Sequence, residues 1–141
     1  MANVIPYAFR GELLTGTHNF ASGGDSFKFA LYTASPYSTA STAYSATNEV
    51  SPSGTGYTTT GNTLSGNAVA YGTAVASCDF DDTAWTTATF TAAFGAIYND
   101  SQSDKLCVVL DFSGNKTCTN GTFTISFPSP STPADAIISM A

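Results

Sequence analysis

Two apolar segments separated by a polar turn constrain the fold of this chain most. Residues 89–98, Thr-Phe-Thr-Ala-Ala-Phe-Gly-Ala-Ile-Tyr, place large apolar side chains between small and polar ones, and residues 106–110 read Leu-Cys-Val-Val-Leu. Between them lies Asn-Asp-Ser-Gln-Ser-Asp, at 99–104. Because side chains of a strand point alternately to opposite faces, this pattern predicts two adjacent strands, 88–98 and 105–112, joined by a turn.

The same pattern recurs along most of the chain. In residues 25–33, Phe27, Phe29 and Leu31 fall on one face of a predicted strand. In residues 122–127, Phe123, Ile125 and Phe127 do the same. Shorter strand-like segments are expected at 57–60, 62–70, 74–80 and 136–140, and Ser-Gly-Asn-Lys at 113–116 predicts a second turn.

About eight strands in 141 residues predict one all-β domain spanning 1–141. We expect an antiparallel β-sandwich or jelly roll, with an immunoglobulin-like sandwich as the nearest alternative. Within the N-terminal segment 1–20, residues 5–15 predict a short helix, since Pro6 suits a first turn and Gly16 suits an end. An extended arm is the alternative.

Residues 34–56 form a long loop rich in Ser and Thr, and long loops in small domains are often functional. Tyrosine is enriched at interfaces, so tyrosines that flank this loop are candidate contacts. The alternative is that they pack the loop onto its own sheet. Together with two N-terminal aromatic residues, the candidate partner-contact residues are Tyr7, Phe9, Tyr37, Tyr44 and Tyr57.

The composition argues against several classes of partner. Charged residues make up 10% of the chain, whereas an average soluble domain has about 25%. The net charge is −6, and the cations are Arg10, Lys28, Lys105 and Lys116. Four scattered cations do not predict binding to nucleic acid or to an anionic membrane surface. No stretch approaches the about 20 apolar residues of a spanning helix, and no secretory signal is recognised at the start.

Ser and Thr together exceed a quarter of the residues. Short hydroxyl side chains lose little conformational entropy when a partner covers them. This composition therefore favours a protein that lies against another surface.

Residues that usually perform catalysis are sparse. His18 is the single histidine, no nucleophile motif lies near it, and we interpret it as a surface or turn residue. Asp79, Asp81 and Asp82 are the densest acidic group, but the full calcium-loop pattern is missing, which favours a solvated turn. We therefore expect a non-enzymatic protein with no catalytic residues, no metal and no cofactor.

The chain has three cysteines, Cys78, Cys107 and Cys118, and no Cys-x-x-Cys pair. Cys107 lies among Val and Leu, which is typical of a buried small hydrophobe. Free thiols are expected in a reducing cytoplasm, with a Cys107–Cys118 bridge as the alternative.

Several short segments resemble one family across the whole chain. They are Ser-Gly-Thr-Gly-Tyr at 53–57, Asp-Asp-Thr-Ala-Trp at 81–85, Ala-Phe-Gly-Ala-Ile-Tyr-Asn-Asp at 93–100 and Ile-Ile-Ser-Met at 137–140. In these the chain resembles small β-rich virion structural proteins of tailed bacteriophages. The resemblance implies synthesis in a bacterial host cytoplasm, a location in the virion, and the major capsid protein or other virion proteins as partners.

The leading hypothesis is a capsid decoration (cement) protein on the phage head, acting as a homo-oligomer. A tail, neck or fibre component is the first alternative. A carbohydrate- or receptor-binding module is the second, and its sugar platform would use Trp85, Tyr37 or Tyr44.

Overall fold

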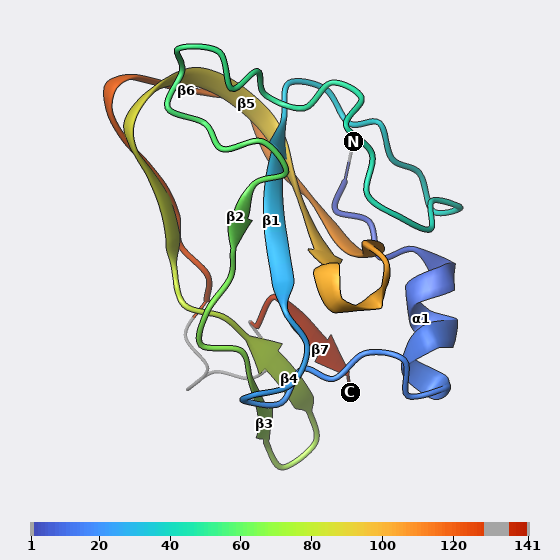
Figure 1. Cartoon of the computed structure of the whole chain (residues 1–141). Coiled ribbons are helices and arrows are strands. Elements are labelled where there is room, and N and C mark those ends of the chain that lie inside the picture. Colours follow the sequence, from blue (N-terminus) through green and yellow to red (C-terminus); the bar gives the residue numbers. More distant parts are fainter. Residues whose placement is uncertain (1, 129–135, 141) are drawn as a thin grey trace.

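The computed structural model describes residues 2–128 and 136–140, in which two antiparallel sheets accompany one short helix (Figure 1). The first sheet has the order β2-β1-β5-β6 and the second the order β3-β4-β7. This confirms the all-β class with a short N-terminal helix. Sheets of four and three described strands fit the sandwich better than a jelly roll, which takes eight strands. The elements are α1 (Tyr7–Leu14), β1 (Phe27–Tyr32), β2 (Asn62–Thr63), β3 (Ala68–Tyr71), β4 (Ala76–Asp79), β5 (Thr83–Asn99), the 3-10 helix η1 (Asp100–Gln102), β6 (Lys105–Ile125) and β7 (Ile138–Met140).

The long hairpin of β5 and β6 dominates the fold, and both strands curve over the top of the molecule in Figure 1. The predicted turn at 99–104 is confirmed: η1 is followed by Ser103 and Asp104 in left-handed conformation, with φ of 57° and 59°. Both strands are longer than the sequence patterns indicated.

The predicted turn at 113–116 is wrong, because this segment is a bulge inside β6. Ala92 pairs with Lys116 and Phe94 pairs with Asp111, so β6 has several more residues than β5 between these pairs. Ser113 and Gly114 have φ of 58° and 115°. Bulges, like turns, use residues that accept positive φ, so the same residue types indicated a turn. Here they bend the strand without reversing it.

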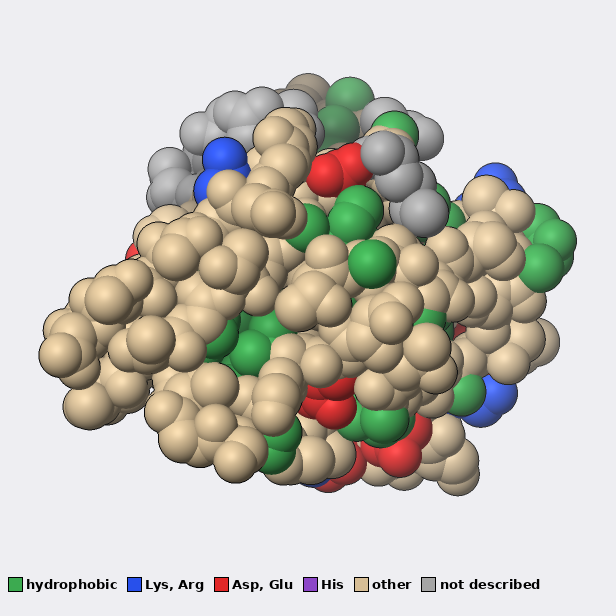
Figure 2. Space-filling model, turned by 90° about the horizontal axis from the view of Figure 1, so that it is seen from above, with side chains coloured by type: hydrophobic (Ala, Val, Ile, Leu, Met, Phe, Trp, Pro, Cys, Tyr) green, Lys and Arg blue, Asp and Glu red, His purple; other side chains and the backbone are tan. Residues whose placement is uncertain are grey.

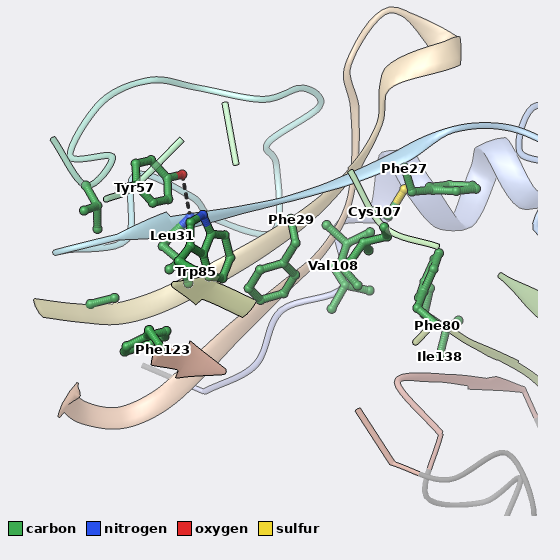
Figure 3. Close-up of a cluster of buried hydrophobic side chains, with 14 of the residues drawn as sticks. Phe27, Phe29, Leu31, Tyr57, Phe80, Trp85, Cys107, Val108, Phe123 and Ile138 are labelled. Atoms are coloured by element: carbon green, nitrogen blue, oxygen red, sulfur yellow. Dashed lines mark hydrogen bonds between the residues drawn. The ribbon is translucent and has the colours of Figure 1, made fainter. Parts of the chain in front are cut away.

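The main core lies on one face of β1, where Phe27, Phe29 and Leu31 point as predicted (Figure 3). Beyond its bulges, the curved hairpin packs its own aromatic residues into the same core. Tyr57 and Trp85 stack with ring centroids 5.8 Å apart, and Phe27 and Phe80 meet edge-on at 5.5 Å. Further residues of this core are Phe90, Cys107, Val108, Phe123 and Ile138.

The opposite face of β1 is buried as well, under the loop 34–56. Ala30 and Tyr32 are fully buried, and they pack with Tyr37, Ala96, Tyr98, Leu106 and Val109. The loop is attached by single β-bridges from Glu49 to Tyr32 and from Ala43 to Lys105. It therefore covers its own sheet, which was the alternative interpretation.

This burial corrects most of the candidate contact residues. Phe9, Tyr37 and Tyr57 are at most 5% exposed, so the folded chain offers no surface there to a partner. Tyr44 is half-buried against Tyr98, whereas Tyr7 is 54% exposed and remains a candidate.

Two further expectations change in the structure. Residues 57–60 form a turn, not a strand, and Gly61 N–H donates to the Thr58 carbonyl at 2.9 Å. The segments 62–70, 74–80 and 136–140 contain shorter strands than expected. Among the described residues, no helix has the length and apolar character needed to cross a membrane.

Candidate functional site

The most extensive buried polar cluster surrounds His18, which sequence analysis wrongly placed at the surface. Its imidazole is fully buried and lies between α1 and the end of β5. Nε2 lies 2.9 Å from a Glu12 oxygen, and Nδ1 lies 2.9 Å from the Asn99 side-chain nitrogen. An amide nitrogen can only donate, so Nδ1 accepts from Asn99, and Nε2 donates to Glu12.

Asn99 connects this histidine to a second carboxylate. The same amide nitrogen donates to Asp25 at 2.8 Å, and the Asn99 side chain is fully buried. The backbone N–H of Asn19 also donates to Asp25, at 2.9 Å. The cluster thus ties α1 and the segment that follows it to the β5–β6 turn.

The two carboxylates are charged partners in this cluster. Burial raises the pKa of Glu12, but hydrogen bonds from Lys105 and His18 outweigh it and hold that pKa below its ordinary value. The Lys105 Nζ lies 2.6 Å from Glu12. For Asp25 burial also raises the pKa, and the Asn19 and Asn99 hydrogen bonds outweigh it, so its pKa is lowered too.

A substrate has no access to the His18 imidazole in the folded chain. The imidazole has no exposed surface, and both of its nitrogens are engaged by the protein. A catalytic base must reach the proton that it removes. The arrangement fits a polar brace that fixes the N-terminal segment, and the sequence spacing gave no signal for it.

A second buried cluster holds the loop 34–56. Glu49 accepts hydrogen bonds from the hydroxyls of Tyr44 at 2.6 Å and Tyr57 at 2.7 Å. The Tyr32 and Tyr37 hydroxyls lie 2.7 Å apart. Burial and then the Glu49 hydrogen bond raise the pKa of Tyr57, so its hydroxyl stays protonated as a donor. These contacts give the loop tyrosines a structural role.

The acidic triplet does not form one site. Asp81 and Asp82 are exposed, and they accept hydrogen bonds from the Ser65 hydroxyl and the Phe127 N–H. Asp79 is instead buried at the end of β4, where burial first and then its two acidic neighbours raise its pKa. Within residues 2–128 and 136–140, no group of three His, Cys, Asp or Glu side chains could hold a metal ion.

All three cysteines are free thiols, as expected by default. Cys107 is fully buried and Cys78 is 5% exposed. Burial raises the pKa of Cys78 to about 12. The bridge between Cys107 and Cys118 does not occur.

An apolar groove of about 80 Å³ lies between α1 and the small sheet. Leu13 and Phe20 form one wall, and β4 and β7 contribute Cys78, Ile138 and Met140. The same elements carry exposed apolar residues, with Leu14 of α1 91%, Tyr71 of β3 84% and Met140 of β7 57% exposed. This is an accessible apolar surface that the sequence analysis did not identify.

Comparison with protein-family models, curated proteins and solved structures found no match for this chain.

Proposed function

We propose that this chain is a non-enzymatic capsid decoration protein, which binds the assembled head shell of a tailed bacteriophage. The imidazole at the centre of the His18 brace has no exposed surface, and we assign the function to the outer surface. A protein that binds only the assembled shell stabilises it by mass action, and many copies add avidity.

The low charge of the β5–β6 hairpin surface, away from residues 99–111, is the observation that carries this proposal. Residues 83–98 contain no charged residue, and Lys116 is the one charged residue between 112 and 128. Exposed side chains there are mainly hydroxyl and amide groups, among them Thr89, Thr117, Thr119, Asn120 and Thr122. Seen from the end where β5 and β6 curve over, uncharged groups and backbone cover most of the surface (Figure 2).

Such a surface suits contact with a large protein shell. Short side chains lose less conformational entropy on contact than Lys, Glu or Arg, and they require less desolvation. Of the three residues of the alternative sugar platform, Trp85 is 2% and Tyr37 4% exposed, and Tyr44 is half-buried. This burial does not favour a sugar platform.

The copy number of the chain in purified virions tests the location. We expect hundreds of copies per particle, measured by quantitative gel analysis against the major capsid protein. A few copies, up to a few dozen, would instead favour the tail, neck or fibre alternative. Absence from the particles would contradict any virion role.

Attachment through the hairpin can be tested separately. Thr119→Glu places a charge on the exposed hairpin surface, and we expect it to reduce cosedimentation with shells that lack the chain. Thr59→Glu is the matched control, because Thr59 is also exposed but lies in the 57–60 turn. Equal binding by both variants would exclude this surface.

A further inference from the structure

The strand β3 lies at an outer edge of the small sheet. In the order β3-β4-β7, the described strands provide β3 with a neighbour on one side only. The β3–β4 turn is closed by a hydrogen bond from Gly72 N–H to the Val75 carbonyl, 2.7 Å long. Gly72 and Val75 therefore form a hydrogen-bonded pair, and such pairs alternate with non-hydrogen-bonded pairs along an antiparallel ladder. Counting back from Gly72, Ala70 and Ala68 direct their backbone N–H and C=O groups to β4. Val69 and Tyr71 therefore direct theirs outward.

The side chains of the same two residues belong to an apolar sheet face. Directly opposite residues of antiparallel strands share a face. One row across the sheet is Val69, Cys78 and Ile138, and the next row is Tyr71, Ala76 and Met140. Leu13 and Phe20 line the groove together with residues of both rows. Tyr71 does not line the groove and is 84% exposed.

Edge strands are usually protected by charges, prolines or bulges. Residues 66–78 contain no charged residue and no proline. The β3–β4 ladder is regular over all four of its pairs. The accessible edge is short, because the Asn67 side chain bonds to the Phe20 and Ala21 carbonyls before it and the turn at Gly72 follows it.

We propose that β3 pairs antiparallel with β3 of a second copy of this chain, around a two-fold axis at Ala70. Val69 of one copy then lies opposite Tyr71 of the other. Their outward N–H and C=O groups form two hydrogen bonds, and symmetry doubles these to four. This register also keeps the apolar faces of both copies on the same side, whereas a shift by one residue would place them on opposite sides.

The β3 edge of one copy matches the β3 edge of another copy in shape and charge. A second copy of this chain is therefore the partner that we propose. The small Val69 meets the large Tyr71 on both sides of the axis. Each chain carries a net charge of −6, but no charged side chain of β3 faces the other copy. Four residues bury less than the about 1,200 Å² of a stable interface, so association should be weak and concentration-dependent. The inference does not depend on the virion role.

Sedimentation velocity of the full chain tests this proposal over concentrations from about 1 μM to about 1 mM. We expect the mass to rise from 14.5 kDa towards twice that value as concentration increases. Val69→Pro removes an outward N–H without removing a bond to β4, and it should keep the chain monomeric. Leu14→Lys changes an apolar residue on α1 that is 91% exposed, and this variant should dimerise like the unmodified chain.

Hydrogen exchange supplies a readout that requires no variant. The amides of Val69 and Tyr71 should become protected at high concentration, in step with the rise in mass. A monomer at every concentration, or a Val69→Pro variant that dimerises normally, would overturn the proposal. Dimerisation without protection of these two amides would overturn it as well.

Discussion

Replacing Asn99 by Ala should destabilise the fold strongly, because its amide holds the buried brace together. Asn99 donates to His18 and to Asp25 from one fully buried nitrogen. Without it, Nδ1 of the buried imidazole has no partner, which costs about 1–3 kcal/mol. Asp25 keeps its hydrogen bond from the Asn19 N–H. The free energy lost at Asp25 is therefore near the lower end of this range, about 1 kcal/mol.

The sum is about 2–4 kcal/mol, a large part of the about 5–15 kcal/mol that stabilises a typical domain. Urea unfolding, followed by the fluorescence of the buried Trp85, measures this change in the free energy of unfolding. Asn115→Ala is the matched control, because Asn115 is exposed, and it should change stability by no more than about 0.5 kcal/mol.

A second substitution separates the lost hydrogen bonds from the lost volume. Asn99→Asp keeps the shape but replaces the donor with an acceptor that faces the Asp25 carboxylate. At neutral pH it should destabilise the chain more than Asn99→Ala does. If Asn99→Ala costs no more than Asn115→Ala, the brace does not stabilise the fold and the reasoning fails.

Two further predictions concern the titratable groups. The folded-state pKa values of Glu12 and Asp25 are lowered, so their contribution to stability is complete above a pH of about 4.5 and is lost as pH falls through the folded values. Urea unfolding between pH 7 and about pH 3 should show this loss as a fall in the free energy of unfolding. Glu12→Gln should make that free energy fall less steeply with pH, and an unchanged pH dependence would contradict the prediction. A thiol reagent should modify the partly exposed Cys118 in the native chain but reach Cys78 and Cys107 only after unfolding. Rapid modification of all three thiols would show that the core opens readily.

Local patterns predicted the elements whose signals are contained in a few neighbouring residues. The alternation of Phe27, Phe29 and Leu31 gave both the strand and its core face. The 99–104 turn was predicted because its polar residues separate two apolar segments. The prediction of a turn at 113–116 was wrong for a local reason too, since the residue types of this segment suit a bulge as well as a turn.

The cluster at His18 was beyond prediction because Asn99 and Lys105, which complete it, are distant from its other members in the chain. Asn99 lies 81 positions from His18, and Lys105 lies 93 positions from Glu12. The tyrosines of the loop 34–56 were ambiguous because their residue type suits an interface as well as packing. The structure shows that they pack, since the Tyr44 hydroxyl bonds to Glu49 and the Tyr37 hydroxyl to that of Tyr32 in β1.

The sequence by itself determined the all-β class, the low charge and the hairpin at the centre of the fold. Strand periodicity, turn chemistry and net charge are properties of neighbouring residues or of the whole composition, so they need no knowledge of contacts. Only the tertiary structure decided that the loop tyrosines pack onto their own sheet, that His18 belongs to a brace, and that β3 is an edge among the described strands. Burial and strand pairing depend on which distant segments meet, and those contacts form only when the chain has folded.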